Sequence, residues 1–282
     1  MMGSNLSTDV RVLELIGWDL DENEDRPEHA RQTRRIDSAQ AIVASRPCFK
    51  TTSPLVHEIP TLLATLLEAQ ILRDDLHREM EGLEWSAGLV DLRHLLAFQR
   101  RLIFDPEYPP PATPASCSWP DLTELAFGPP LSTSAVTTLT STPGELVLQS
   151  PNPNMRLRQA TTTASMPFEL HGGSPFFEVA EYQGRWFLRD GYHRAAHLLR
   201  GGIVHVPAVI IRASSLLELG AIGPWFFQEQ VLFSAHPPYV SDFLLEPLTQ
   251  QYTRPRTLKT LRVTIEESFG PAPSHPLTGE QR

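Results

Sequence analysis

The residues best suited to chemistry lie in one polar turn near residue 190. The turn reads Arg189-Asp190-Gly191-Tyr192-His193-Arg194. The spacing of apolar residues predicts a strand over residues 185–188 before it and a helix over 192–199 after it. A helix entered through glycine presents free backbone N–H groups and partial positive charge, and His193 and Arg194 add two side-chain donors there. The pattern therefore predicts binding of a phosphate or a carboxylate.

The same turn also has an interpretation without a ligand. Asp190 would then cap the N-terminus of the helix and Gly201 its C-terminus, with Gly191 as a turn residue. Arg194 would pair with a carboxylate, and His193 would be solvated. The sequence leaves both interpretations open.

Carboxylates ahead of the turn are candidates for a catalytic base. Glu178 and Glu181 flank a predicted hairpin, and phosphoryl transfer requires a carboxylate opposite the anion site as its general base. Acidic residues on a hairpin are also common as surface charges. A basic run farther along the chain either extends an anion site or protects a solvated strand edge; it consists of Arg254, Arg256, Lys259 and Arg262.

Histidine spacing raises the alternative of a metal ion. His193 and His197 are four residues apart and would lie on one helical face, with His205 or Asp190 as a further ligand. No glutamate follows the first histidine, as it does in the helical motif of metalloproteases. We therefore predict no metal site.

The elements that must position the turn belong to the second half of the chain. Residues 145–268 have the pattern of a compact α/β unit, with Gln183-Gly184 as the turn of a hairpin. Short helices are expected at 216–219 and between 225 and 248. Strands are expected at 146–148, 176–182, 185–188, 206–212 and 258–266.

The first half is predicted to be mainly helical, over residues 1–104. It has one strand-like run at 10–16 and two periodic apolar stretches, 60–83 and 88–104, that predict a helical hairpin. Residues 105–144 are rich in Pro, Ser and Thr and are expected to form a linker with one docked helix over 119–127. Residues 269–282 are expected to form a disordered tail. The predicted fold class is α/β (α+β), with a small mixed sheet in the second half.

The turn and its surroundings resemble the ParB/sulfiredoxin-like superfamily. The resemblance rests on Phe187 to Ala196, followed by Gly201 and Val206-Pro207-Ala208-Val209-Ile210. These give a strand, a D-G-x-H-R turn, a helix and a V-P-V-type strand in the order typical of that superfamily. Ser150 to Arg156 is similar to the N-P-x-x-x-R segment of ParB domains, so the matching stretches span about sixty residues.

The resemblance implies a nucleotide- or phosphate-binding protein, with phosphoryl transfer as its reaction if it is an enzyme. ATP, ADP or CTP would be the ligand, with Mg²⁺ as the accompanying ion. Gly191, His193 and Arg194 would contact phosphate, with Arg189 and Tyr192 beside them in the binding turn. Asp190 would orient the turn or assist proton transfer, and Glu178 is the candidate base. Sulfiredoxins have a cysteine where this chain has Tyr192, which argues against sulfinic-acid repair.

Two other functions stay open. One is a non-enzymatic regulatory or interaction protein with a protein partner, and the other is a DNA-associated partition-type protein. A net charge of −9 argues against affinity for nucleic acid and for anionic membranes. The chain shows no helix-turn-helix pattern after residue 212, no signal peptide and no apolar run of the ~18 residues that a membrane span needs. Its two cysteines form no disulfide framework, so a cytoplasmic protein is expected.

Overall fold

The computed structural model describes residues 9–18, 33–106, 118–128, 138–142, 144–150, 155–159, 168–171, 174–223 and 226–264. Helices occur beside sheets that contain parallel and antiparallel strand pairs, which confirms the predicted α+β class. The chain divides into two compact units. The first comprises Met1–Ser132 and Ser174–Arg256, and the second comprises Thr133–Gly173 and Thr257–Arg282.

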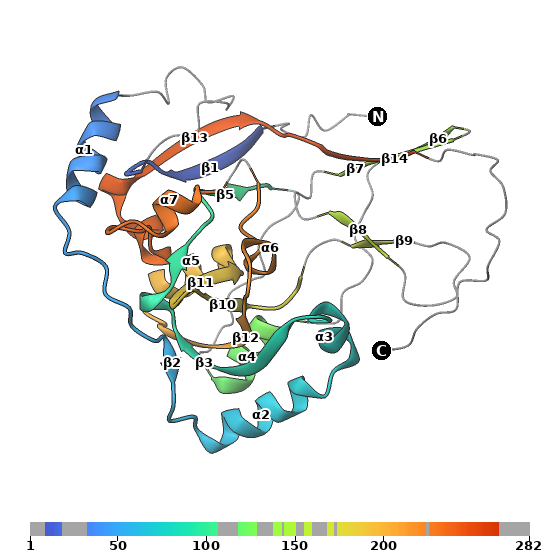
Figure 1. Ribbon diagram of the computed structural model, residues 1–282, viewed down its shortest axis with the longest axis horizontal. Helices are drawn as coiled ribbons and strands as arrows, with labels where there is room; N and C mark the ends of the chain where they lie inside the picture. The colour runs from blue at the N-terminus through green and yellow to red at the C-terminus, as the bar shows by residue number, and fades with distance from the viewer. Residues whose placement is uncertain are drawn as a thin grey trace, which may run out of the picture. The chain divides into compact units, whose positions relative to one another are not determined.

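The larger sheet of the first unit has six strands in the order β2-β3-β12-β10-β11-β4 (Figure 1). β10 and β11 form an antiparallel hairpin, and β12 lies parallel to β10. The chain forms helix α5 (Tyr192–Arg200) between β11 and β12, so the predicted order of strand, turn, helix and strand is confirmed. The strand bounds are Leu55–Val56 for β2, Glu84–Asp91 for β3, Leu96–Ala97 for β4, Glu178–Tyr182 for β10, Arg185–Asp190 for β11 and His205–Arg212 for β12.

The hairpin turn at Gln183-Gly184 is also confirmed. Gln183 has a φ of 50° and Gly184 a φ of 73°, and both values lie in the left-handed region. Two-residue turns of this kind match the right-handed twist of the strands that they join. The turn fixes the register of residues 179–182 of β10 against residues 185–188 of β11. An irregularity between Glu178 and Val179 then shifts the pairing by one residue and places Glu178 opposite Asp190.

A second sheet of the first unit has three strands in the order β13-β1-β5. β1 (Asp9–Leu15) is the central strand, and Figure 1 shows it running beside β13 (Thr249–Pro255), while β5 (Arg101–Phe104) pairs with its other edge. Side chains alternate between the two faces. One face carries a small apolar cluster with Val12 and Tyr252, and the other carries Arg11 and Leu13.

Short helices complete the first unit. α5 packs against the 3-10 helix η3 (Val240–Leu244), where the rings of Tyr192 and Phe243 lie 6.3 Å apart. The predicted short helices at 119–127 and 216–219 are confirmed as α4 and α6. The bounds are Thr33–Ala44 for α1, Thr61–Ile71 for α2, Asp74–Glu79 for α3, Trp119–Phe127 for α4, Leu216–Leu219 for α6, Glu229–Leu232 for α7, Leu92–His94 for η2 and Glu246–Leu248 for η4.

The predicted helix over residues 88–104 is wrong. These residues form the end of β3, then η2, β4 and β5. Gly88 explains part of the difference, because it lies opposite Ala208 in the sheet, and an added Cβ there would come within 2.7 Å of the Ile210 side chain. The close approach of β3 to β12 favours a strand near Gly88, although the spacing of the leucines also fits a helix.

The predicted division into a helical first half, a linker and a second domain is wrong as well. β3 and β4 from the first half join the same sheet as β10, β11 and β12. Within the expected linker, α4 belongs to the first unit and buries Leu122 and Phe127. Contacts between segments far apart in the chain therefore define the units. The expected tail, residues 269–282, lies outside the described residues.

The second unit contains two small sheets. β7 (Glu145–Ser150) pairs with both β6 (Thr138–Thr142) and β14 (Lys259–Thr264), and β8 (Arg156–Gln159) pairs with β9 (Phe168–His171). Residues 151–154 of the predicted N-P segment lie outside the described residues. Among the helices that the structure describes, none combines the length and the apolar character needed to cross a bilayer.

Candidate functional site

Gly191 at the start of α5 has no room for a side chain. Its φ of 101° is in the left-handed region, and an added Cβ would lie 2.7 Å from the ring of Phe177. Gly191 is the N-cap residue, so the expectation that Asp190 caps the helix is wrong by one position. Gly201 does stand at the C-cap, as predicted. The glycine is explained by packing on Phe177, without reference to a ligand.

The guanidinium of Arg194 points into the protein. Its Nη1 donates to the carbonyls of Leu125 and Pro175 at 3.0 and 2.6 Å, and its Nη2 donates to the carbonyl of Phe176 at 2.8 Å. Burial lowers the pKa of Arg194, while Asp190, at 3.7 Å, and Glu178 oppose this shift. Arg194 therefore holds the segment before β10 against α4 and α5, and it has few donors left for a phosphate.

Tyr192 and His193 are also used by the protein itself. The hydroxyl of Tyr192 accepts hydrogen bonds from the backbone N–H groups of Phe98 and Gln99, at 3.0 and 3.3 Å. Nε2 of His193 lies 2.9 Å from the carbonyl of Ile103. Burial lowers the pKa of His193, so the ring is neutral and its Nε2–H donates to this carbonyl. The expectation of a solvated His193 is wrong, and the ring offers no cation to a ligand.

Arg189, Glu178 and Asp190 form a charged group at the edge of the turn. Nη1 of Arg189 donates to a carboxylate oxygen of Glu178, whose side chain is only 1% exposed, and Nε of Arg189 donates to the carbonyl of Glu218 at 3.0 Å. The second carboxylate oxygen of Glu178 has no hydrogen-bond partner in the described part of the chain. Glu181 instead forms an exposed ion pair with Arg212. Glu178 is thus enclosed and paired. Because a general base needs access to a substrate, this position does not suit the predicted role of Glu178 as a catalytic base.

Asp190 titrates unusually high for an aspartate. Loss of hydration in its crowded surroundings and then the charge of Glu178 raise its pKa from 3.8 to about 7, although 32% of its side chain is exposed. The two arginines and the N–H of Gly191 act in the opposite direction. Asp190 is therefore the group of the turn that gains and loses a proton near neutral pH.

The raised pKa of Asp190 predicts a pH-dependent stability. In the unfolded chain the group ionises near 3.8, so between pH 4 and 7 the folded state binds more protons, and its stability falls as the pH rises. Asp190→Asn lacks this dependence. We expect wild type to lose about 1–2 kcal/mol relative to Asp190→Asn between pH 4 and 8, after allowance for solvent screening. Urea unfolding of both proteins across this range is the measurement, and a constant difference would contradict the assignment.

A separate cleft lies beside α5 and has a volume of about 550 Å³. One wall is the face of the β13-β1-β5 sheet, with the side chains of Arg11, Leu13, Phe104, Thr249 and Gln251. Arg35 of α1, Arg200 of α5, Phe243 and Leu244 of η3, and Glu246 of η4 line the rest. We call it the arginine cleft, after Arg11, Arg35 and Arg200. Its volume is in the range of small-molecule sites.

Among the described residues, no carboxylate forms an ion pair with the three arginines of the cleft. The guanidinium of Arg11 lies over the ring of Phe104, 4.6 Å from its centre, and Nη2 of Arg35 donates to the carbonyl of Thr249 at 3.0 Å. Arg200 makes no hydrogen bond or ion pair with any residue in the described ranges. Three cations thus share one concave surface, a setting suited to an anion.

The sequence alone gave little indication of this cleft. The alternation in β1 does place Arg11 and Leu13 on one face, and Arg200 ends the predicted helix. Arg35 and Arg200, however, are brought together only by the packing of α1, α5 and η4 around the small sheet. His193 connects the two regions, because its ring packs on Phe104 at 5.2 Å.

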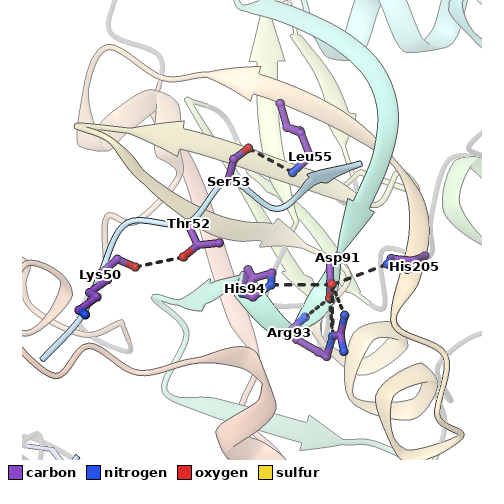
Figure 2. A network of polar contacts seen from close by, with 8 residues as sticks. All are labelled: Lys50, Thr52, Ser53, Leu55, Asp91, Arg93, His94 and His205. Atoms are coloured by element: carbon purple, nitrogen blue, oxygen red, sulfur yellow. Dashed lines mark hydrogen bonds and ion pairs between the residues drawn. The ribbon is translucent and has the colours of Figure 1, made fainter. Parts of the chain in front are cut away.

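A second polar cluster surrounds Asp91 at the end of β3 (Figure 2). Arg93 binds the carboxylate through Nε and Nη2, and Nε2 of His94 and of His205 lie 3.8 and 3.6 Å from its Oδ2. Burial opposes ionisation, yet the hydrogen bonds from Arg93 lower the pKa of Asp91. Asp91 is thus ionised and already paired.

The alternative metal set does not assemble around His193. His205 lies beside Asp91, and His193 is bound to the carbonyl of Ile103. Among the described residues, no three His, Cys, Asp or Glu side chains are arranged to hold a metal ion.

The structure therefore brings the six residues of the predicted turn together, but packing and internal hydrogen bonds occupy most of them. No protein-family model matches the chain, and the searches of curated proteins and of solved structures gave no match either.

Proposed function

We propose that the protein binds a small phosphorylated ligand in the arginine cleft. The observation that carries this proposal is the presence of Arg11, Arg35 and Arg200 around one cavity, without an ion pair to a described carboxylate. The proposed ligand chemistry, recognition of a phosphate, is the one that the sequence predicts for the turn near residue 190. The proposed position is the cleft at the C-terminal end of α5, where Arg200 lies, and not the N-terminus of that helix.

Electrostatics favours an anion in this cavity. Guanidinium groups that face one another without counter-charges repel, and an anion between them relieves the repulsion while it gains charge-assisted hydrogen bonds. Arginine also presents a planar fork that fits phosphate or carboxylate oxygens in pairs. Arg35 and Arg11 are already oriented, by the carbonyl of Thr249 and by the ring of Phe104. Less side-chain entropy is then lost when a ligand binds.

The apolar part of the cleft suits the remainder of such a ligand. Leu13, Phe104, Phe243 and Leu244 line it beside the arginines. Ligand sites commonly combine an apolar lining with a few polar groups that fix orientation. ATP, ADP and CTP, each with and without Mg²⁺, are therefore the first ligands to test, together with inorganic phosphate. Glu178 and Asp190 do not line the cleft, so the proposal is binding, without an assigned reaction.

Substitution of one arginine tests the location. Arg35→Gln removes a cleft cation, and Arg34→Gln removes an exposed cation from the neighbouring position of α1, outside the cleft. We expect ligand at about 100 times its dissociation constant to stabilise wild type and Arg34→Gln by roughly 2.7 kcal/mol. For Arg35→Gln we expect about tenfold weaker binding, because a charge-assisted bond to the anion is lost.

Thermal unfolding with and without ligand is the measurement, and Arg200→Gln should repeat the result for Arg35→Gln. Equal ligand stabilisation of wild type, Arg35→Gln and Arg200→Gln would place the anion elsewhere. If wild type melts cooperatively and none of the tested anions stabilises it, the proposed anion binding is wrong.

A further inference from the structure

The arginine cleft also contains one carboxylate. Glu246 lines the same cavity as the three arginines and is exposed to solvent. Its carboxylate makes no ion pair within 4.0 Å with those arginines or with any other cation of the described ranges. The cavity therefore presents three positive groups and one negative group that do not neutralise one another.

Arg35 and Glu246 lie on elements that Thr249 links by two hydrogen bonds between side chain and backbone. Arg35 donates to the carbonyl of Thr249, and the hydroxyl of Thr249 contacts the carbonyl of Glu246 at 3.4 Å. α1 also packs against η4, which begins at Glu246. Arg35 and Glu246 form no ion pair within 4.0 Å, although their elements are in contact. Opposite charges thus stand on neighbouring elements, both facing the cavity and both available to a ligand.

Resting on the function proposed above, we propose that the cleft selects a small zwitterion, in which an ammonium group stands a few bonds from a phosphate or carboxylate. Arg35 and Arg200 bind the anionic group, and Glu246 binds the ammonium. A ligand that carries only negative charge meets repulsion from Glu246, which opposes part of the attraction of the arginines. Glu246 thus favours a ligand with an ammonium group over a ligand that carries the same anionic group without one.

Pairs of ligands that differ mainly in an ammonium group measure how much that group contributes to binding. O-phosphoethanolamine and ethyl phosphate carry the same phosphate, and only the former has an ammonium group. β-Alanine and propionate form the corresponding carboxylate pair. Titration calorimetry on the full chain would compare wild type, Glu246→Gln and the control Glu229→Gln, which removes an exposed carboxylate of α7 outside the cleft.

We expect wild type and Glu229→Gln to bind the ammonium-bearing member of at least one pair about fivefold more tightly, which is typical of one partly solvated ion pair. In Glu246→Gln this preference should fall to about one, and binding of ethyl phosphate should become stronger. The two pairs distinguish phosphorylated amines from amino acids as the ligand.

Two results overturn the inference in different ways. If ethyl phosphate binds wild type through Arg35 and the ammonium adds nothing, the cleft is an anion site and the role of Glu246 is wrong. If neither member of either pair binds wild type, the anion site itself is wrong, and the selectivity proposed for it is wrong with it. A preference that survives unchanged in Glu246→Gln would assign the ammonium to another group and contradict the proposal.

Discussion

Arg194→Ala is expected to lower the free energy of unfolding by about 3–5 kcal/mol, the range found when one partner of a buried charged group is removed. The substitution leaves the carbonyls of Leu125, Pro175 and Phe176 without their donor. It also removes a cation that lies 3.7 Å from the carboxylate of Asp190. Urea unfolding of the full chain measures the loss.

Arg200→Ala, in the last turn of the same helix, is the matched control. Arg200 is exposed and has no hydrogen bond or ion pair within the described residues, so the expected change in unfolding free energy is below about 0.5 kcal/mol. We therefore expect substitution of Arg194 to lower stability and substitution of Arg200 to weaken ligand binding. If Arg194→Ala kept wild-type stability and lost anion binding, the turn would be the site and the arginine cleft would not.

The second large effect is expected at Gly191. Gly191→Ala places a methyl group 2.7 Å from the ring of Phe177 and forces alanine to a φ of 101°. The left-handed conformation costs about 1–2 kcal/mol, and overpacking adds about 1–3 kcal/mol, so a total loss of about 2–5 kcal/mol is expected. Equilibrium unfolding in urea gives the value.

Gly202→Ala separates the two contributions. Gly202 has a φ of 79°, and the space around it is open to 4 Å, so this variant should lose only the conformational part, about 1–2 kcal/mol. Equal destabilisation by the two substitutions would show that contact with Phe177 does not constrain Gly191. A larger loss at Gly191 would support a glycine required by packing against Phe177.

Local signals in the sequence were sufficient for several elements. The turn at Gln183-Gly184, the helix after Gly191 and the strand that begins near Val206 follow from alternation, helical spacing and glycine positions. Such signals depend on residues close in the chain, whose backbone conformational preferences favour a turn, a helix or a strand. The helix over 119–127 belongs to the same class, because Ser118 caps it and its apolar residues recur at helical spacing.

The candidate site could be predicted only in part. The sequence indicated Asp190 and Glu178 as two separate candidates for proton transfer, and a register shift in the hairpin places them opposite each other. The cleft could not be found this way, because Arg11, Arg35 and Glu246 come from three separate segments. No pattern within any one segment marks them as neighbours, and their common cavity is created by packing.

The sequence by itself determined the order of β11, α5 and β12 and the residue types available at the turn. The tertiary structure decided where the side chains of that turn point. Arg194 has more donors than its own helix can use, and the carbonyls that satisfy them belong to α4 and to the segment before β10. Buried polar groups must find partners, and distant segments supplied them. Tertiary contacts also decided the stretch from Gly88 to Phe104, which forms strand segments and the short helix η2. Pairing with β12, β11 and β1 outweighed a helical spacing that the local sequence could equally support.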